Sequence, residues 1–399
     1  MTAPLLLDLT HTSHTGARTG IQRVTRNLCA ALGSRALPIC HDPYANAWRG
    51  LQPWEKANLS PVGSPGAKRG AHWPVSARVG GRLHRWFGGG ATPETNRLPK
   101  AHGVLVPEVF SPAVASALPA LFAAVPGPRA ALFHDAIALK YPELTPPKTV
   151  ARFPAYLREL LQFDGVAAVS EDSRQSLLEY WEWLGVTNPP PVAAIPLGID
   201  VPGPSEPIRP AGPDQVPVVL SVGSLEGRKN HLALLDACEQ LWSAGGSFEL
   251  RLIGLAQPQT GRAALARLRD LQAKGRPLRY GGPVDDVALE AAYRECAFTV
   301  YPSLIEGFGL PVLESLARGK PCICSGQGAL GEAARDGGCV TLRIGDATEI
   351  AGAIARLLFH PEERQALALA AQARSFKTTA IYAGELLAWM KALSRREPA

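Results

Sequence analysis

The sequence predicts an α/β fold made of two doubly wound domains. In both halves of the chain, short apolar runs typical of buried parallel strands alternate with helical patterns, as expected of successive βα units. Residues 201–215 separate the halves, and five of these fifteen residues are proline, so neither a helix nor a central strand can continue there. The length of 399 residues agrees, because single cores stop growing at roughly 250 to 300 residues.

The first domain is expected at residues 1–205. It opens with a strand at residues 4–9, a loop that contains Gly16 and Gly20, and a helix at residues 21–32. Further strands are expected at residues 103–106, 130–133, 166–169 and 192–195, with helices at residues 149–163 and 171–184. This alternation implies a mainly parallel sheet with helices packed on it.

The second domain is expected at residues 206–375, followed at residues 376–399 by a helix that crosses back to the first domain. Its expected strands are at residues 216–222, 248–253, 278–280, 298–301 and 321–324, and its helices at residues 229–244, 262–274, 286–295 and 310–318. Ligands of open sheets bind beyond the carboxyl ends of the strands. Two such domains that face one another would form a ligand-binding cleft.

Bulk composition narrows the class of protein. Hydrophobic residues make up 46% of the chain and charged residues 19%, which supports two hydrophobic cores and excludes a largely disordered chain. No apolar run approaches the ~20 residues of a membrane span, and the run before Asp8 is too short for a signal sequence. We therefore expect a cytoplasmic location, with peripheral attachment to the inner face of the cytoplasmic membrane as an alternative.

The cysteines do not follow the spacing of a disulfide framework or a zinc knuckle. No two of them form a CxxC pair, and their number is odd. We interpret them as reduced packing residues without a chemical role. The seven are Cys29, Cys40, Cys238, Cys296, Cys322, Cys324 and Cys339.

Residues 61–100 hold the net positive charge of the chain, which is +6. The basic residues in this segment are Lys68, Arg69, Arg78, Arg82, Arg85, Arg97 and Lys100, against the single acid Glu94. Apolar side chains that include Trp86 and Phe87 recur at helical spacing beside Arg78, Arg82 and Arg85, which predicts a basic amphipathic helix facing an anionic acceptor or membrane surface. The alternative is a surface insertion whose aromatic side chains dock on the domain.

The most specific motif is PSLIEGFGLPVLESLARGKP at residues 302–321. Glycines on either side of Phe308 allow the backbone to approach a ligand, and the helix that starts at Leu310 directs free amides and the positive end of its dipole at an anion. A diphosphate fits this position. Glu314, about one turn into the helix, could then hold a ribose diol, and Glu306 in the loop would face the sugar. Structural acids favoured by the helix dipole are the alternative.

A second motif, VLSVGSLEGRKNH at residues 219–231, is a strand that ends at Gly223 and Ser224 and delivers Arg228 and Lys229 to the start of a helix. Cations at a helix N-terminus oppose the dipole, so a bound anion would compensate for their placement. A diphosphate leaving group needs such cations here, because no Asp-x-Asp pair for a divalent metal is evident in the sequence. The alternative is that Arg228 and Lys229 are solvated surface cations that bind no ligand.

Together the motifs resemble the retaining, metal-independent family 4 glycosyltransferases of GT-B fold, in which two Rossmann-like domains face one another across a cleft. The resemblance runs in family order from Thr15 to about Leu387, and the Glu306/Glu314 pair is its most specific element. The matching segments are EGFGLPVLE, VGSLEGRKN, FHDAIALKYPE at residues 133–143, AAVSEDSRQSLLEYW at residues 167–181 and IPLGID at residues 195–200.

The resemblance implies a role for each matching residue. Arg228 and Lys229 would neutralise the donor diphosphate, and Glu314 would hold the ribose. The donor sugar and phosphates would meet Glu306, the backbone of Phe308, Gly309 and Leu310, and, from the other domain, His134, Gly16 and Gly20. The chain departs from the family at Ser224, where many relatives have Arg, and at Leu197, where many have Asn.

The expected function is transfer of a hexose or deoxyhexose, GDP-mannose being the favoured donor, to a glycan or lipid-linked acceptor in bacterial surface polysaccharide synthesis. No metal, cofactor or nucleic-acid partner is expected, since the nucleotide-sugar is a substrate. One alternative is a GT-B-fold sugar-nucleotide epimerase, and another is a catalytically silent scaffold in envelope assembly. A glycoside hydrolase that uses Glu306 and Glu314 is less favoured, because it would not need a phosphate site.

Overall fold

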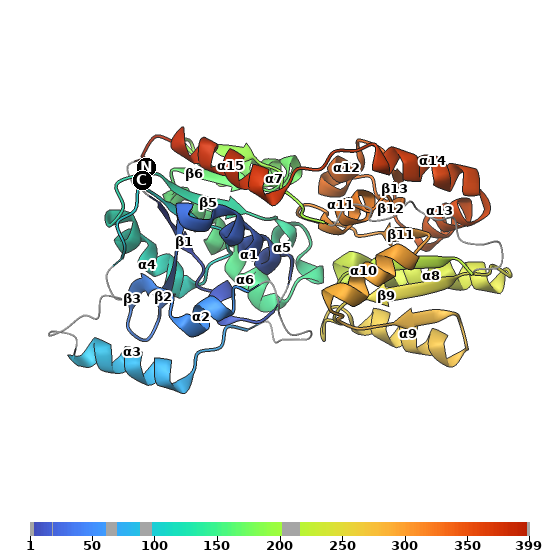
Figure 1. The fold of residues 1–399 in the computed structure, drawn as a ribbon, viewed down its shortest axis with the longest axis horizontal. Coiled ribbons are helices and arrows are strands. Elements are labelled where there is room, and N and C mark those ends of the chain that lie inside the picture. The colour runs from blue at the N-terminus through green and yellow to red at the C-terminus, as the bar shows by residue number, and fades with distance from the viewer. Residues whose placement is uncertain (1–3, 18, 61–69, 88–97, 202–215, 397–399) are drawn as a thin grey trace. The chain divides into compact units, whose positions relative to one another are not determined.

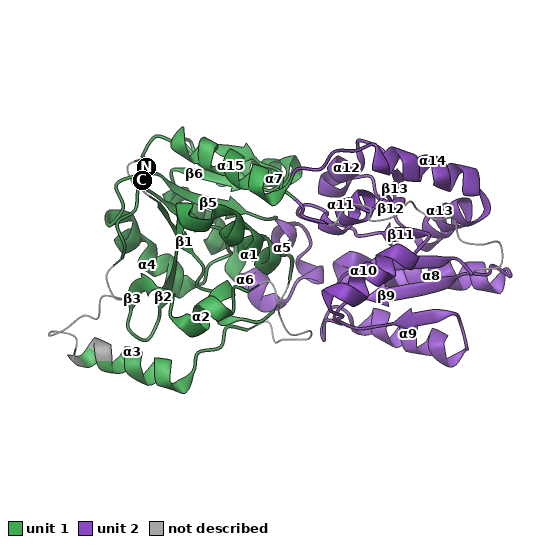
Figure 2. Ribbon diagram, in the orientation of Figure 1, with its two compact units in different colours: residues 1–135, 152–198, 378–399 green, residues 136–151, 199–377 purple. Residues whose placement is uncertain are grey.

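The computed structural model describes residues 4–17, 19–60, 70–87, 98–201 and 216–396 (Figure 1). It divides into two compact units (Figure 2). Unit 1 comprises residues 1–135, 152–198 and 378–399, and unit 2 comprises residues 136–151 and 199–377. Each unit contains one sheet dominated by parallel strands, so the predicted α/β fold with two doubly wound sheets is confirmed.

The sheet of unit 1 has the strand order β3-β2-β1-β4-β5-β6-β7, in which only β3 runs antiparallel to its neighbour. Its strands are β1 (Leu5–Asp8), β2 (Ala36–Asp42), β3 (Ala47–Gly50), β4 (Val104–Val106), β5 (Arg129–Phe133), β6 (Gly165–Ala168) and β7 (Val192–Ala194). Its helices include α1 (Gly20–Leu32), α2 (Pro53–Ala57), α3 (Val75–Phe87), α4 (Pro112–Ala123), most of α6 (Pro147–Glu159), α7 (Glu171–Trp183) and α15 (Thr379–Lys391). The central strands are buried along their whole length, as their apolar sequences require.

The sheet of unit 2 is parallel throughout, with the order β10-β9-β8-β11-β12-β13. Its strands are β8 (Val218–Val222), β9 (Glu249–Ile253), β10 (Leu278–Tyr280), β11 (Phe298–Tyr301), β12 (Cys322–Ser325) and β13 (Cys339–Leu342). Its helices include α5 (Ile137–Lys140), α8 (His231–Ser243), α9 (Arg262–Ala273), α10 (Asp286–Glu295), α11 (Leu310–Ala317), α12 (Gly328–Ala334), α13 (Ala347–Phe359) and α14 (Pro361–Gln372).

Residues 136–151 belong to unit 2 in the structure, whereas the sequence analysis placed them in the first domain. One reason is the position of Leu144, because a Cβ built on Gly227 would lie 3.0 Å from the Leu144 Cδ2 atom. The backbone of Gly227 and this apolar side chain therefore pack closely. No local pattern in residues 136–151 reveals a partner so far along the chain.

The C-terminal helix α15 packs in unit 1, where it lies beside α1 (Figure 1). The segment around it also closes over the start of β6, since a Cβ on Gly165 would lie 2.7 Å from Leu393 and 3.0 Å from Trp389. Only glycine leaves room for these side chains. Within the described residues, no helix combines the length and apolar composition that crossing a bilayer requires.

Candidate functional site

The predicted site residues of unit 2 gather where its strand order reverses direction. β8 and β11 are parallel neighbours at the centre of the sheet, and the chain builds outward from them on either side. The loops after these two strands therefore leave the sheet at the same edge, which is the usual ligand site of doubly wound folds. One loop carries Arg228 and Lys229, and the other carries Glu306.

The structure brings these three side chains into one ion cluster. The Arg228 guanidinium lies 2.5 Å from Glu306 Oε2 through its Nη1 atom, and the Lys229 ammonium donates a hydrogen bond to Glu306 Oε1. The second Arg228 nitrogen, Nη2, lies 2.7 Å from Glu226 Oε1. The Glu306 carboxylate thus holds two cations side by side at the start of α8.

The cluster remains partly open to solvent. The side chains of Arg228, Lys229 and Glu306 are 22%, 13% and 11% exposed. Burial alone would raise the pKa of Glu306, but the charges of Arg228 and Lys229, with hydrogen bonds from Lys229 and Ser303, lower it to about 2. Glu306 is therefore an anion at every physiological pH and cannot act as an acid there.

Three polar side chains of this region were not singled out in the sequence. Glu226 contacts Arg228 and also accepts a 2.9 Å hydrogen bond from the Ser224 hydroxyl. His231 is buried at the first position of α8, where burial and the charge of Lys229 lower its pKa to about 3. Ser303 donates to Glu306. All three lie within the two quoted motifs, and their closeness in sequence to the cation pair (Glu226 and His231) or to Glu306 (Ser303) was the signal that could have identified them.

The helix α11 begins in the geometry that the motif predicts. Gly309 has a φ of 94°, a left-handed conformation that favours glycine, and a Cβ there would lie 3.0 Å from Leu330. Leu310 is the first residue of the helix, and Phe308 before it is half-buried. Glu314 lies one turn further on and is 4% exposed. Glu306, the N-terminus of α11 and Glu314 thus all lie on the chain segment that follows strand β11.

A close backbone approach shapes the other loop of the site. A Cβ on Gly254, at the end of β9, would lie 1.9 Å from the carbonyl oxygen of Gly223, at the end of β8. Gly254 also has a φ of 145°. A side chain at position 254 would displace Gly223 and Ser224, so the loop that carries Arg228 depends on this glycine.

In unit 1, His134 follows β5 and is buried, with 6% of the residue exposed. Its Nε2 atom lies 2.7 Å from the carbonyl oxygen of Pro107, and burial lowers its pKa below the ordinary value of 6.5. The ring is therefore neutral at neutral pH. Because the Pro107 carbonyl can only accept, Nε2 carries the proton and Nδ1 is the remaining acceptor.

The loop after β1 contains Gly16 and Gly20, both exposed. A Cβ on Gly20 would meet nothing within 4 Å. Beneath them, two carboxyl groups are buried at the carboxyl ends of the neighbouring strands β1 and β4, namely Asp8 and Glu108. The Glu108 carboxylate accepts hydrogen bonds from the backbone amides of His11 and Thr12 at 3.0 and 2.9 Å. Burial raises the pKa of Glu108 to about 8 and that of Asp8 to about 6.

A second buried network fixes the same loop from the other side. Glu55 accepts two hydrogen bonds from Arg49, at 2.7 and 2.8 Å, and lies 2.9 Å from the His14 Nε2 atom. Arg49 also donates to Asp42 at 3.1 Å. Stacking of His14 on Trp73, with ring centroids 3.8 Å apart, covers the network. Each of the charged side chains is at most 6% exposed.

Helix α3 lies within the basic segment. Four apolar side chains spaced along it are exposed, namely Val75 at 72%, Val79 at 50%, Leu83 at 51% and Trp86 at 84%. Arg78 and Arg82 on the same helix are also exposed. The side chains of Arg85 and Phe87, and residues 61–69 and 88–97 with Lys68, Arg69 and Arg97, lie outside the described part of the structure.

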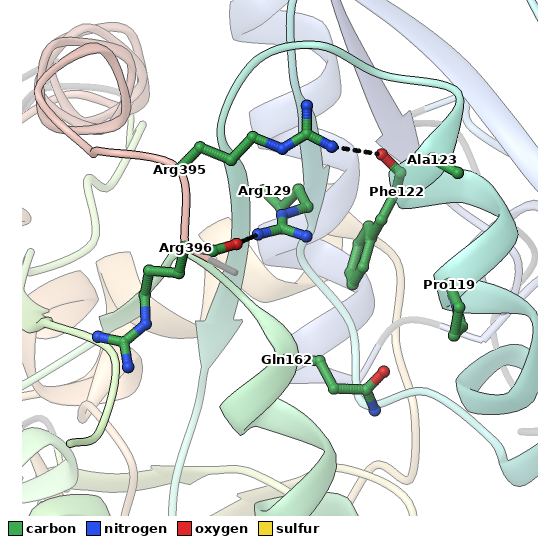
Figure 3. A pocket seen from close by; sticks show the side chains of 7 residues that line it. All are labelled: Pro119, Phe122, Ala123, Arg129, Gln162, Arg395 and Arg396. Atoms are coloured by element: carbon green, nitrogen blue, oxygen red, sulfur yellow. Dashed lines mark hydrogen bonds between the residues drawn. The ribbon is translucent and has the colours of Figure 1, made fainter. Parts of the chain in front are cut away.

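A cavity of about 510 Å³ in unit 1 lies away from these loops (Figure 3). Its lining includes Arg129, the first residue of β5, and Gln162, which precedes β6. Both positions belong to the amino ends of parallel strands, the edge opposite to the usual ligand site. The Arg129 guanidinium is already paired with the buried Asp164 carboxylate. The remaining lining residues are Pro119, Phe122, Ala123, Arg395 and Arg396.

Comparison with known proteins places unit 2 in a family. Residues 206–374 match the family described as glycosyl transferases group 1. The chain is 26% identical over 335 residues to the serotype-specific mannosyltransferase WbdA of Escherichia coli, a match that covers 81% of this chain and 38% of WbdA. It is also 35% identical over 122 residues to O-antigen chain mannosyltransferase B of Escherichia coli, covering 30% and 32% of the two chains. The chain thus spans well under half the length of these relatives.

Solved structures show the same fold. Sucrose-phosphate synthase from Thermosynechococcus elongatus superposes with a TM-score of 0.67 at 19% identity, over 98% of this chain and 100% of the other. Anabaena Alr3699/HepE in complex with UDP and glucose gives a TM-score of 0.66 at 14% identity, with the same coverage. These neighbours are GT-B glycosyltransferases. The chain therefore shares the fold of these proteins, and its residues 206–374 match the glycosyl transferases group 1 family.

Proposed function

We propose that this chain transfers a hexose or deoxyhexose from a nucleotide-sugar to a glycan or lipid-linked acceptor, with retention of the anomeric configuration. The observation that supports this most strongly is the Arg228–Glu306–Lys229 cluster, which stands at the switch point of a group 1 domain beside the N-terminus of α11. Two cations and a helix N-terminus complement the diphosphate of the donor.

In the proposed mechanism the cations carry most of the catalysis. Negative charge accumulates on the diphosphate as its bond to the sugar breaks, and Arg228 and Lys229 stabilise that charge. Glu306 holds the two cations in position before the donor arrives, which avoids reorganisation during the reaction. The leaving phosphate takes the proton of the acceptor hydroxyl, so no protein base is required. Neutral His134 is proposed to contact the transferred sugar, and Glu314 the ribose.

We propose that the donor is GDP-mannose and that transfer needs no divalent metal. The names of the matched relatives, two mannosyltransferases, support a mannosyl donor. The cation pair supports metal independence, because it supplies the positive charge that a metal would otherwise bring. Gly16, Gly20, Gly223, Ser224, Phe308, Gly309 and Leu310 are proposed to form the donor-binding surface with the residues above.

Donor turnover in Arg228→Ala and Lys229→Ala tests this proposal. Each variant should release nucleoside diphosphate from GDP-mannose at least tenfold more slowly than the native chain, since one such cation contributes about 3 kcal/mol to the transition state. Native activity should survive EDTA and depend on an acceptor. Arg279→Ala, which removes a surface arginine that is 72% exposed, is the matched control. Near-normal turnover in both site variants, or loss of activity in EDTA, would contradict the assignment.

We further propose that α3 places the enzyme against an anionic lipid surface. Val75, Val79, Leu83 and Trp86 fall on one stripe of the helix, and Arg78 and Arg82 flank that stripe. Apolar side chains can enter the headgroup region while the arginines meet lipid phosphates, an arrangement typical of interfacial helices. A lipid-linked acceptor would be reached at that surface.

Binding to liposomes distinguishes a membrane-binding role of α3 from the alternative, a surface insertion that contacts no lipid. Replacing Arg78 and Arg82 by Ser should weaken binding to vesicles that contain anionic lipid, because each cation near such a surface contributes about 1 kcal/mol. The effect should fade as salt rises, and donor binding should not change. Lys274→Ser with Arg279→Ser removes the same charge from exposed positions of unit 2 as a control. Equal vesicle binding by all three proteins would refute the surface role.

A further inference from the structure

Three cysteines that are scattered in the sequence converge in unit 2. Cys322 and Cys324 are two residues apart in β12, so their side chains point to the same face of the sheet. Cys339 begins β13 directly beside Cys322 in the parallel register. The three Sγ atoms all lie within 4.8 Å of one another.

The surroundings of this cysteine cluster are apolar. Cys322 and Cys324 are fully buried, and the side chains around them include Tyr301, Leu316 and Leu330. Cys339 is half-buried, so it is the only one of the three residues with appreciable exposed surface. The cluster is therefore shielded from water at Cys322 and Cys324, and Cys339 is its most exposed member.

One cation lies close to the sulfur atoms. The Arg374 side chain is 8% exposed, and its Nη1 atom donates to the carbonyl oxygens of Ala333 and Gly337 at 3.0 and 3.1 Å. Its Nη2 atom lies 3.6 Å from Oδ2 of Asp336, a carboxylate that is 74% exposed, so solvent screens this ion pair. The charge of Arg374 acts on Cys324 and Cys339, which places this cation beside the cluster.

We propose that Cys322, Cys324 and Cys339 form a three-thiolate binding site for the soft monovalent cation Cu(I). Thiolates select soft metals. Metal–sulfur bonds of about 2.3 Å in a trigonal site separate the sulfur atoms by about 4.0 Å, so separations within 4.8 Å need little adjustment. Within the described residues, this potential ligand group contains no histidine or carboxylate.

The number of ligands favours Cu(I) over Zn(II). Structural zinc sites are almost always four-coordinate, whereas three sulfur ligands here complete a trigonal site. The bound complex carries two net negative charges, and Arg374, which also lies 3.6 Å from the exposed Asp336 carboxylate, offsets part of this charge. Binding displaces the protons of the thiols, and the half-buried Cys339 provides the entry path. This inference concerns a site separate from the Arg228–Glu306–Lys229 cluster and does not depend on the proposed sugar transfer.

Anaerobic titration of the full chain with Cu(I), in competition with the chromophoric chelator bicinchoninate, tests the site. The native protein should remove one equivalent of Cu(I) from the chelator, and Cys339→Ser should weaken that binding at least a hundredfold. Cys29→Ser, which replaces a half-buried cysteine of unit 1, and Cys238→Ser, which replaces a buried lone cysteine of unit 2, are the matched controls and should bind as the native chain does.

A second measurement protects the test against misfolded variants. In the native chain, bound Cu(I) should slow the alkylation of Cys339, as read by mass spectrometry of the tryptic peptides, while the equally half-buried Cys29 stays as reactive as without Cu(I). The proposal is overturned if the native chain leaves Cu(I) with the chelator or if Cys339→Ser binds normally.

Discussion

The loops that follow β1 in unit 1 and β8 in unit 2 occupy equivalent places in two sheets with the same central strand order, but they use charge in opposite ways. In unit 1, the loop after β1 contacts Glu55 through His14, and the ion cluster of Glu55, Arg49 and Asp42, which lie on α2, β3 and β2, is at most 6% exposed. In unit 2, Arg228, Lys229 and Glu306 retain exposures of 11% to 22%. The fold places both loops at equivalent positions. The charged side chains at the loop of unit 1 are buried and stabilise the fold, whereas those of unit 2 are partly exposed and can contact a ligand.

The largest expected effect contrasts two arginines. Arg49→Ala leaves Glu55 and Asp42 as uncompensated buried anions, so it should lower the free energy of unfolding of unit 1 by about 3–5 kcal/mol. Arg228→Ala leaves Glu306 paired with Lys229 near solvent and should lower the stability of unit 2 by less than about 1 kcal/mol. Urea unfolding, with hydrogen exchange of β2 and β8 amides to separate the units, measures both. Equal losses of stability in Arg49→Ala and Arg228→Ala would show that the two arginines do not differ in their structural role.

A smaller effect is expected from the pH dependence of unit 1. Folded Glu108 keeps its proton to about pH 8, whereas an ordinary glutamate ionises near pH 4.5. This group therefore stabilises the fold fully below pH 4.5, and its contribution is lost as the pH rises toward 8. Relative to Glu108→Gln, which cannot ionise, native unit 1 should lose on the order of 3 kcal/mol between pH 4.5 and 8.

Unfolding of the two proteins at several pH values provides the comparison. If native and Glu108→Gln proteins lose stability in parallel, the Glu108 carboxyl group does not hold its proton in the fold over this pH range. Glu306 cannot cause such a loss of stability, because its lowered pKa acts only at acid pH.

The smallest stability effect is expected at Gly20, the first residue of α1. A Cβ there meets no atom within 4 Å, so Gly20→Ala should change stability by less than about 0.5 kcal/mol. If the loop approaches the donor phosphates, the same methyl group should raise the KM for the donor. Gly33→Ala, at a left-handed φ of 53° after α1, should instead cost about 1 kcal/mol and leave KM unchanged. An unchanged KM in Gly20→Ala would show that this loop does not contact the donor.

Much of this fold was predictable because buried parallel strands have continuous apolar sequences. The expected strands at residues 278–280 and 298–301 coincide with β10 and β11, and the others differ by a few residues. Three strands were missed, namely β2, β3 and β13, and β13 is a four-residue edge strand that is only partly buried. β2 contains Pro38 and ends in His41 and Asp42, and β3 contains Arg49, so neither has the apolar continuity of a central strand.

The site was predictable only in part. The motifs placed Arg228, Lys229 and Glu306 at loop ends, and the reversal of strand order explains why those loops meet. That Glu306 binds both cations depends on side chains 77 and 78 positions apart, which no local spacing can reveal. The same holds for Cys339, which joins Cys322 and Cys324 only because β12 and β13 pair in register. The burial of side chains, which distinguishes the Arg49 cluster from the Arg228 cluster, likewise depends on tertiary structure.

The return of α15 to unit 1 has a consequence for the order of events during synthesis. Residues 199–377 of unit 2 leave the ribosome before residues 378–399, which supply α15 and the side chains of Trp389 and Leu393 that cover Gly165. Domains fold as units once their segments are available. Unit 2 can therefore complete its sheet while unit 1 still lacks part of its surface cover. We expect a chain released before Thr378 to bind a hydrophobic dye through unit 1, while hydrogen exchange in β8 stays native.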